Sequence, residues 1–316
     1  MNSHARHRFS RSQSMNPSAQ STPSASQLPA AASRAADRSA VLCIGEYGAD
    51  DAAAAWAVEY ASAHDQTLTL VHVIDPQTND DAHPATQAEV GAATELLETT
   101  ADHIRFTNRA LDIVVHVSNG NVHDEILRLS APETLLVFGA PAGPGGSRAR
   151  NSLGITLAST AYGPVAVIPA PDAQARQGVM AAVDGTETAM TAALFAASEA
   201  ALLGLELRVI SVWREPPIWQ ETFIDSRTRN ELERGNRAVL NAAVDRLRLA
   251  FPSLAVTGLL CHADTVEALV SEAQSASLLV VGSRQNHGLR RLLLGSTSHG
   301  ILTSLPAPTI VVGNVT

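Results

Sequence analysis

The sequence contains no lysine, so all 22 basic residues among its 316 are arginine. This absence excludes two kinds of chemistry. A Walker A loop requires a lysine on the phosphates of its nucleotide, and a Schiff-base enzyme requires an amine. The formal net charge is −9. An acidic protein lacks the positive face that broad nucleic-acid binding requires, so we expect no nucleic-acid partner.

Cysteines, aromatic residues and long apolar runs are also scarce. Cys43 and Cys261 lie far apart in apolar, strand-like segments, which favours two buried, reduced thiols over a disulfide framework or a structural zinc site. Aromatic residues make up 4% of the chain, too few for platforms that stack bases. No apolar run reaches the roughly 18 residues of a membrane span, so we expect no membrane partner.

Residues 1–38 differ in composition from the rest of the chain. They are rich in Ser, Ala, Gln, Pro and Arg and lack the apolar core of about 7–15 residues that a signal peptide contains. We expect them to form a disordered tail. Together with the reduced cysteines, this predicts a cytoplasmic protein.

The remainder of the chain is an internal duplication. Each half contains five short apolar segments of strand type, which alternate with segments of helical periodicity. The expected strands of the first half are 41–45, 67–74, 111–117, 135–139 and 164–168. Those of the second half are 179–183, 205–213, 253–260, 278–282 and 308–312. The expected helices are 51–64, 86–108 and 122–130, then 187–203, 228–250 and 264–275, and each half has one more before its last strand.

Strands that alternate with helices in this way indicate parallel sheets covered on both faces. Right-handed crossovers then give a doubly wound α/β layer. We therefore predict two tandem doubly wound domains, each with a five-stranded parallel sheet, over residues 39–170 and 176–316. The linker between them lies within residues 169–178, which are rich in proline and polar residues.

In doubly wound folds, ligands bind beyond the carboxyl ends of strands where the strand order reverses. The loops that follow the first and fourth strands of each half therefore define the candidate sites. In the second half these loops contain DGTET at 184–188 and a glycine-rich stretch at 282–296. In the first half they contain EYGAD at 46–50 and a glycine-rich stretch at 139–152.

Four pieces of the second half resemble the universal stress protein family. They are VDGT (183–186), ISVW (210–213), VVGSR (280–284) and LLLGSTS (292–298). Each piece alone is common, but the four occur in order at the expected places of a duplicated doubly wound unit. The resemblance covers residues 39–316 and implies a tandem member with adenine nucleotide alpha hydrolase-like domains that bind ATP or another adenine nucleotide.

The ATP-binding members of this family carry G-x2-G-x9-G-(S/T) after the fourth strand. In this chain the pattern starts at Gly282 and ends at Gly295 and Ser296, with the expected spacing, but Gln285 replaces its second glycine. Glycine admits close approach to a ligand, and Ser296 is a natural N-cap for the following helix. The start of a helix offers free N–H groups and a positive dipole end to phosphate.

The resemblance assigns the other contacts of the nucleotide. Asp184 matches the family's acid on the ribose and adenine side, and backbone groups near Val183 and Val212 would contact the adenine edge. The predicted binding residues are Ala182, Val183, Asp184, Val212, Val281, Gly282, Arg284, Gln285, Gly295, Ser296, Thr297 and Ser298. Two structural alternatives remain open. Residues 184–186 also suit a turn with a helix cap, and Ser296 also suits a cap with no ligand. Mg²⁺ is an open question.

Two departures from the family pattern concern the binding sites. We expect Gln285 to weaken nucleotide binding rather than abolish it, because its amide can donate to a phosphate. In the first half, Tyr47 stands where the acid would be, and Asn151 and Ser152 align with Gly295 and Ser296 only after a deletion. We therefore expect the first half to have lost the site.

Other chemistry finds little support. The histidines show no metal-ligand spacing, and we predict structural roles for His72, His116 and His262. Trp213 and Trp219 suit either a ligand lid or a packing cluster. No residue is predicted to be catalytic. The last strand of each half is apolar and sits at a sheet edge, and such an edge invites pairing with another strand. The family implies that these two strands form an intrachain pseudo-dimer, and also suggests homodimers.

Three functions are compatible with the sequence. The first is a stress-response protein that binds an adenine nucleotide as a regulatory signal rather than as fuel. The second is a nucleotide-free module that acts through dimerisation and partner contacts. The third is a slow nucleotide hydrolase with Asp184 or His287 near the phosphates. We favour the first because no water-activating base has a clear partner.

Overall fold

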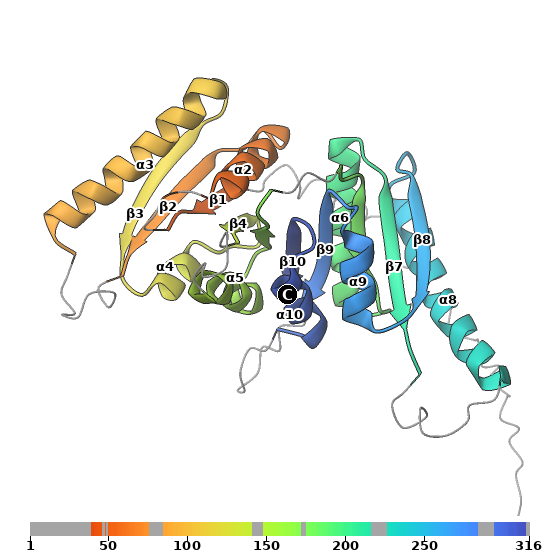
Figure 1. Cartoon of the computed structure of the whole chain (residues 1–316). Coiled ribbons are helices and arrows are strands. Elements are labelled where there is room, and N and C mark those ends of the chain that lie inside the picture. The colour runs from red at the N-terminus through yellow and green to blue at the C-terminus, as the bar shows by residue number, and fades with distance from the viewer. Residues whose placement is uncertain are drawn as a thin grey trace, which may run out of the picture.

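The computed structural model describes residues 39–45, 48, 50–75, 85–140, 148–171, 175–215, 226–283 and 294–313. Strands and helices alternate along the chain (Figure 1). The elements of the first half are β1 (Ser39–Cys43), α2 (Asp51–Ala63), β2 (Leu68–Ile74), α3 (Gln87–Thr107), β3 (Ile113–Asn119), α4 (Val122–Arg128), β4 (Thr134–Gly139), α5 (Arg148–Thr160) and β5 (Val165–Ile168). Residues 1–38, predicted to be a disordered tail, lie outside the described residues.

The second half repeats this order. Its elements are β6 (Val179–Ala182), α6 (Glu187–Leu203), β7 (Leu207–Trp213), α8 (Ser226–Ala250), β8 (Val256–His262), α9 (Thr265–Ala273), β9 (Leu278–Ser283), α10 (Ser296–Ser304) and β10 (Thr309–Gly313). The predicted strands and helices are present, and most bounds differ by one to three residues. The predicted tandem of doubly wound α/β units is therefore confirmed.

The ten strands form one sheet, in the order β3-β2-β1-β4-β5-β10-β9-β6-β7-β8. Strands within each half are parallel, whereas β5 and β10 pair antiparallel across the junction between the halves. In that pairing Ile310 lies opposite Ala166. The last strand of each half thus has a neighbour on both sides, and the outer edges of the sheet belong to β3 and β8.

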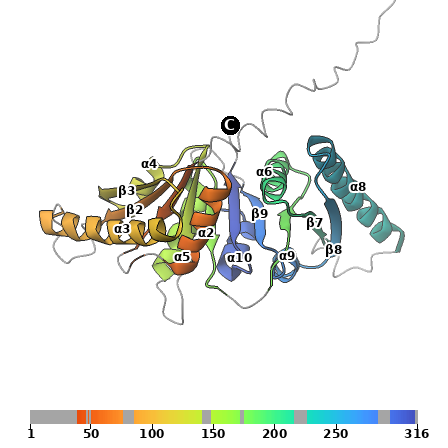
Figure 2. The same ribbon diagram turned by 90° about the horizontal axis from the view of Figure 1, so that it is seen from above.

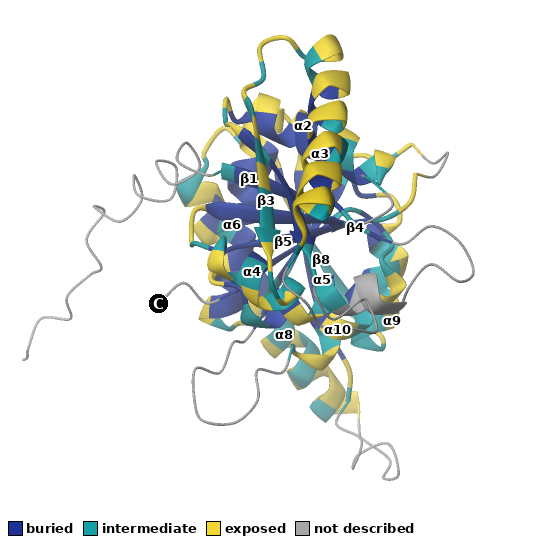
Figure 3. Ribbon diagram, turned by 90° about the vertical axis from the view of Figure 1, so that its left-hand side faces the viewer, coloured by how far each residue is buried: buried dark blue, intermediate teal, exposed yellow. Residues whose placement is uncertain are grey.

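Helices cover both faces of the sheet. One apolar core lies under α2, α3, α6 and α8, and a second lies under α4, α5, α9 and α10. Seen from above, the strands of the first half run between α4 on one side and α3 on the other (Figure 2). The central strands are buried and the outer surface of α3 is exposed (Figure 3). Each large apolar side chain fully buried in these cores stabilises the fold by roughly 1.5–3 kcal/mol.

Local signals explain where α6 begins and ends. Its N-cap is Thr186, whose hydroxyl accepts a hydrogen bond from the Ala189 N–H at 3.3 Å. The helix ends at Gly204, which adopts the left-handed conformation (φ 66°) that glycine accommodates without strain. Between these caps alanine predominates, and alanine has the highest helix propensity. The small side chains also let α6 lie close to the sheet.

The two cysteines depart from the prediction of full burial. Cys43 and Cys261 are both free thiols with intermediate exposure. Burial nevertheless raises the pKa of each thiol above its ordinary value, and the effect is larger for Cys43. The thiolate forms are therefore disfavoured at neutral pH, which makes both side chains poor nucleophiles. Within the part of the chain that the structure describes, no helix is both long and apolar enough to cross a membrane.

Candidate functional site

The strand order places a topological switch point at the carboxyl ends of β6 and β9. These strands are parallel neighbours, but their following helices leave on opposite faces, α6 over the first core and α10 over the second. We refer to the space beyond these two strand ends, between the starts of α6 and α10, as the crevice. Ligands of doubly wound proteins bind at such a point.

The segment after β6 forms the first wall of the crevice. The Val183 N–H donates to the Ile210 carbonyl at 2.9 Å, which continues the sheet by one residue. The Asp184 Oδ1 atom accepts hydrogen bonds from the Thr186 N–H at 3.0 Å and the Thr186 hydroxyl at 2.6 Å. Gly185 between them has φ 83°. Asp184 thus shapes a turn that delivers the cap of α6, and its exposed side chain stands at the rim of the crevice.

The end of β7 offers backbone groups toward the same crevice. Its last register pair with β6 is Ile210 with Ala182, and the Ile210 carbonyl points to β6, where it accepts from Val183. Alternate residues of a strand direct their backbone groups to the same neighbour, so those of Val212 also point to the β6 side. The backbone N–H and carbonyl of Val212 thus lie beyond the last residue of β6. A planar ring with a donor and an acceptor on one edge can pair with them.

Gly282 has a different role from the one that the sequence suggests. A Cβ atom at this position would lie 2.9 Å from the Thr188 carbonyl oxygen and 3.2 Å from the Ala189 Cα. The glycine is therefore required by the close approach of the α6 backbone. Its own carbonyl accepts a hydrogen bond from the Ser298 hydroxyl at 3.1 Å, which ties the first turn of α10 to the end of β9.

The start of α10 forms the second wall, and here the predicted cap is wrong. Gly295, not Ser296, is the N-cap, and no side chain caps the helix. The first backbone bond of the helix runs from the His299 N–H to the Gly295 carbonyl, so the N–H groups of residues 296–298 have no partner within it. A Cβ at Gly295 would have no atom of the described residues within 4 Å, and Gly295 and Ser296 are both exposed.

Ser283 is a site residue that the sequence reasoning did not single out. Its side chain is 1% exposed, and its hydroxyl makes no hydrogen bond to any described residue. Alternation along β9 places it on the same face as Val281, which belongs to the core beneath α9 and α10. A buried hydroxyl without a partner is costly and calls for one. The sequence signal that could have indicated Ser283 is its position directly after the apolar run LLVVG.

Several predicted residues cannot be placed. Arg284, Gln285 and His287 of the second half, and Tyr47 of the first, lie outside the described residues, as does Trp219. The described segments bring the other predicted residues to one place. Ala182 is the last residue of β6, and Val183 and Asp184 follow it. Val212 is the second-last residue of β7, and Val281 and Gly282 come directly before Ser283, which ends β9. Gly295 caps α10, and Ser296, Thr297 and Ser298 are its first three residues.

The equivalent crevice of the first half is built differently. Helix α5 begins at Arg148, so Asn151 and Ser152 lie within the helix rather than at its start, and their predicted alignment with Gly295 and Ser296 is wrong in structural terms. A Cβ at Gly139 would lie 2.4 Å from the Asp50 Cβ. The Asp50 carboxylate caps α2 at this point, so the chain's own negative charge occupies the switch point.

A polar cluster lies beside the crevice, at the ends of β7 and β8. Trp213 stacks on His262 with 4.3 Å between ring centroids, and the His262 Nε2 atom lies 2.7 Å from Glu215 Oε2. Glu215 also pairs with Arg229 at 3.1 Å. The hydrogen bond from His262 lowers the pKa of the Glu215 carboxyl below its ordinary value. These contacts agree with the packing cluster that the sequence suggested for Trp213 as an alternative to a ligand lid. The side chain of His262 is partly exposed.

The other two strand histidines have separate settings. His72 is buried, and its Nδ1 atom lies 2.9 Å from the Ile44 carbonyl. This is the structural role predicted for it. His116 is exposed on β3. Among the described residues, no three His, Cys, Asp or Glu side chains gather where they would hold a metal ion.

The fold is that of a tandem doubly wound α/β protein whose second half presents a helix start without a side-chain cap. The Universal stress protein family matches this chain twice, over residues 38–169 and 176–313. A universal stress protein of Mycolicibacterium smegmatis is 31% identical over 284 residues, which cover 83% of this chain and 92% of that protein. One from Mycobacterium tuberculosis is 27% identical, with coverage of 84% and 94%. The chain belongs to the universal stress protein family.

Solved structures agree at the level of the fold. A putative universal stress protein from Pseudomonas aeruginosa has a TM-score of 0.61 at 16% identity, covering 90% of this chain and 95% of its own. A universal stress protein from Archaeoglobus fulgidus has a TM-score of 0.61 at 16% identity, with coverage of 88% and 97%. Both alignments span the two halves of the chain.

Proposed function

We propose that this protein binds an adenine nucleotide in its second domain, residues 176–316, as a regulatory ligand in the stress response. The observation that carries the proposal is the uncapped start of α10 at the β6–β9 switch point. The buried hydroxyl of Ser283 at the end of β9, which has no partner among the described residues, supports it. Three converging N–H groups with a positive dipole end form a site for a phosphate group. The first domain, residues 39–170, would support the second without a site of its own.

The residues present fit such a ligand from end to end. Phosphate oxygens would accept from the N–H groups of Ser296, Thr297 and Ser298. The backbone of Val212, which extends past the end of β6, would pair with the adenine edge. Asp184 at the rim would accept from ribose hydroxyls with a carboxylate already oriented by Thr186. The ligand would be ATP or another adenine nucleotide, and Mg²⁺ would accompany its phosphates through their own oxygens.

Assembly and location complete the proposal. The antiparallel pairing of β5 with β10 supports an intrachain pseudo-dimer of the two domains, and a homodimer would then use another surface. The free thiols of Cys43 and Cys261 support a cytoplasmic protein. The nucleotide would act as a signal, and no hydrolytic role is assigned to any residue.

The test places a carboxylate at the start of α10. Ser296→Asp adds a negative charge where the helix dipole favours it, so we expect an unchanged or slightly higher thermal midpoint. The same charge repels phosphate, so we expect titration calorimetry with ATP to show affinity reduced at least about tenfold, or roughly 1.4 kcal/mol. The matched control, Gln87→Asp, adds the same charge at the exposed first residue of α3, in the other half of the chain, and should bind ATP as the wild type does.

Two further measurements sharpen the result. Gln285→Gly restores the family glycine, and tighter ATP binding in this variant would support the predicted role of Gln285. Purified protein denatured in acid releases any bound ligand for ion-exchange analysis. Co-purified ATP supports the proposal. If no variant gives heat on titration with ATP and none releases a bound ligand, the nucleotide-free interaction module is favoured instead. Conversion of added ATP to ADP or AMP would favour the slow hydrolase.

A further inference from the structure

An ionisable pair lies buried between the two halves of the chain. His64 ends α2 in the first half and Glu199 belongs to α6 in the second, and the His64 Nε2 atom lies 3.0 Å from Glu199 Oε2. The two side chains are 2% and 1% exposed. This contact is an ion pair when the imidazole is protonated.

The surroundings fix one proton on the histidine. The His64 Nδ1 atom lies 2.8 Å from the Tyr60 carbonyl oxygen, which only accepts, so Nδ1 carries hydrogen. The imidazole also stacks on the Tyr60 ring, with 3.9 Å between centroids. The ring is thus held in place by its own helix, and Nε2 is the nitrogen left to face the partner helix.

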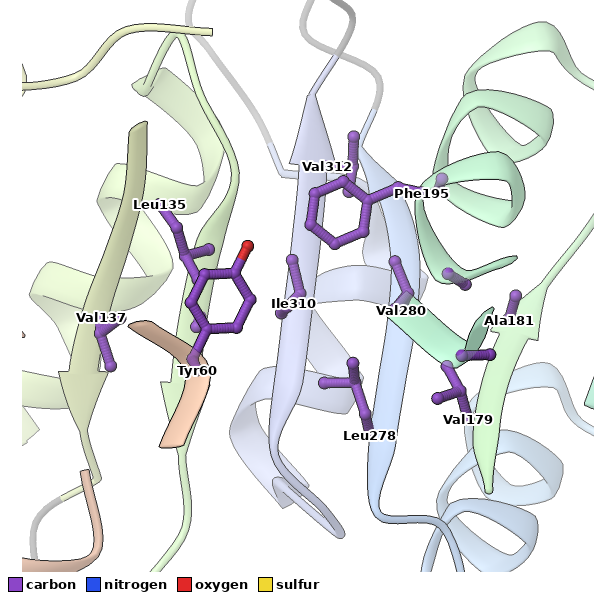
Figure 4. Packing of buried hydrophobic residues seen from close by; sticks show 14 of the residues in the cluster. Tyr60, Leu135, Val137, Val179, Ala181, Phe195, Leu278, Val280, Ile310 and Val312 are labelled. Carbon is purple, nitrogen blue, oxygen red and sulfur yellow. The ribbon is translucent and has the colours of Figure 1, made fainter. Parts of the chain in front are cut away.

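The rest of the junction is apolar. Tyr60 of α2 and Phe195 of α6 lie on the same face of the sheet, over Ile310 and Val312 of β10 (Figure 4). Strands β4, β5, β9 and β10 contribute no ionisable side chain to this core, and Cys43 of β1 packs on the opposite face.

Few other titratable groups belong to these helices. On α2, Tyr60 is buried, and Asp51 and Glu59 are exposed. On α6 the other charged residue is Glu187, which is exposed at the opposite end and pairs with Arg246 of α8. The His64–Glu199 pair therefore sets the charge at the centre of the junction.

We propose that His64 and Glu199 form a proton-dependent latch that holds α2 of the first half against α6 of the second. The pair is neutral overall when it holds one proton in addition to the Nδ1 hydrogen. That proton lies either on Nε2, which gives imidazolium with carboxylate, or on Glu199, which gives imidazole with carboxylic acid. A second proton leaves a buried net positive charge, and loss of the first leaves a buried net negative charge. Either state is costly in an apolar core.

This chemistry distinguishes a latch from ordinary packing. Burying an ion pair contributes little net stability compared with apolar residues of similar size, but removal of one charge from such a pair is strongly destabilising. Protonation and deprotonation remove one charge without any mutation. The junction is therefore tightest in a window of pH and opens on both sides of it, whereas an apolar junction would respond to neither change. The latch operates without any nucleotide.

The test measures opening of the junction by hydrogen exchange of the full chain. Exchange of residues 57–64 and 192–200, corrected for the intrinsic rate, is followed from about pH 3 to about pH 9. Residues 207–210 of β7, before the Trp213–His262 contact, are the internal reference. We expect minimal opening inside this range. Where the open and closed forms of the junction differ by one bound proton, the opening equilibrium should change about tenfold per pH unit.

Isosteric variants separate the two limbs of the pH profile, which are the rise in opening at acid pH and the rise at alkaline pH. Glu199→Gln cannot acquire net negative charge, so the alkaline limb should disappear while the acid limb remains. The double variant His64→Gln/Glu199→Gln should show neither limb. His123→Gln is the control, since His123 is a partly exposed histidine next to Asp124 in the same half, and it should keep the wild-type profile.

Two results would overturn the latch. One is a wild-type junction whose opening, relative to β7, stays constant across the range. The other is a double variant that keeps both limbs. If the double variant does not fold, the loss or persistence of the alkaline limb in Glu199→Gln alone decides the question.

Discussion

At the scale of single residues, two glycines of one predicted motif differ in what requires them. Gly282 is required by the backbone of α6, because a Cβ there would meet the Thr188 carbonyl at 2.9 Å. Gly295 faces open space and has φ −55°, a conformation available to any residue. The first glycine thus maintains the packing of the switch point, and the second leaves room for an approaching group.

This contrast predicts different costs for the same substitution. Gly282→Ala forces α6 and β9 apart, so we expect a loss of about 1–3 kcal/mol in the free energy of unfolding, which is typical of overpacking. Gly295→Ala should change it by less than about 0.5 kcal/mol. Urea denaturation of both variants measures the difference. Equal losses in the two variants would contradict the assignment of Gly282 to helix packing.

At the scale of elements, the two halves differ most in the helix that follows the fourth strand. Helix α10 starts at Ser296 without a side-chain cap, whereas α5 starts a full turn earlier relative to its partner strand β5. Asp50 of the first half also brings a carboxylate to Gly139. An anion site needs an accessible helix start and no competing negative charge, so these differences support the proposal that the site belongs to the second half.

A second element-scale feature gives a pH-dependent prediction. The pair of Glu215 with His262 ties the end of β7 to the end of β8, and it lowers the pKa of the Glu215 carboxyl. A lowered folded-state pKa contributes stability that is present above the unfolded value and is lost as the pH falls through the folded value. We therefore expect Glu215→Gln to lose less stability than wild type on acidification. Urea midpoints between about pH 7 and pH 3 test this.

The control for this measurement is Glu231→Gln. Glu231 pairs with Arg227 at 3.3 Å on the exposed start of α8, and exposed pairs contribute little. This variant should follow the wild-type acid profile. If Glu215→Gln also follows it, the tie between β7 and β8 carries no pH-dependent stability.

At the scale of the whole molecule, the antiparallel contact of β5 with β10 joins two parallel sheets into one. It covers the edge that each five-stranded half would otherwise expose. Helices α2 and α6 meet over one face of this junction through His64 and Glu199, and α5 and α10 lie over the other. The junction thus buries apolar strand edges that invite association when they are open.

The whole-molecule prediction follows from that edge. A chain of residues 175–313 alone exposes β10, so we expect it to associate into dimers or larger species. Light scattering after size exclusion measures the mass. The backbone groups of Pro308 point to β9, so by alternation those of Val311 point to the exposed edge. Val311→Pro in this shorter chain removes an edge N–H group and should reduce the association. A monomer before the substitution would show that β10 needs no partner strand.

The sequence by itself determined the duplication, the alternation of strands and helices, and the location of the candidate site. These features depend on local periodicity and on the short-range signals of glycine and proline. The tertiary structure decided what the local pattern leaves open. The glycine at 282 makes room for α6, and the cap of α10 is Gly295. Ser283 is buried and makes no hydrogen bond to any described residue. Each depends on contacts between segments far apart in the chain, as does the pairing of His64 with Glu199 across the halves.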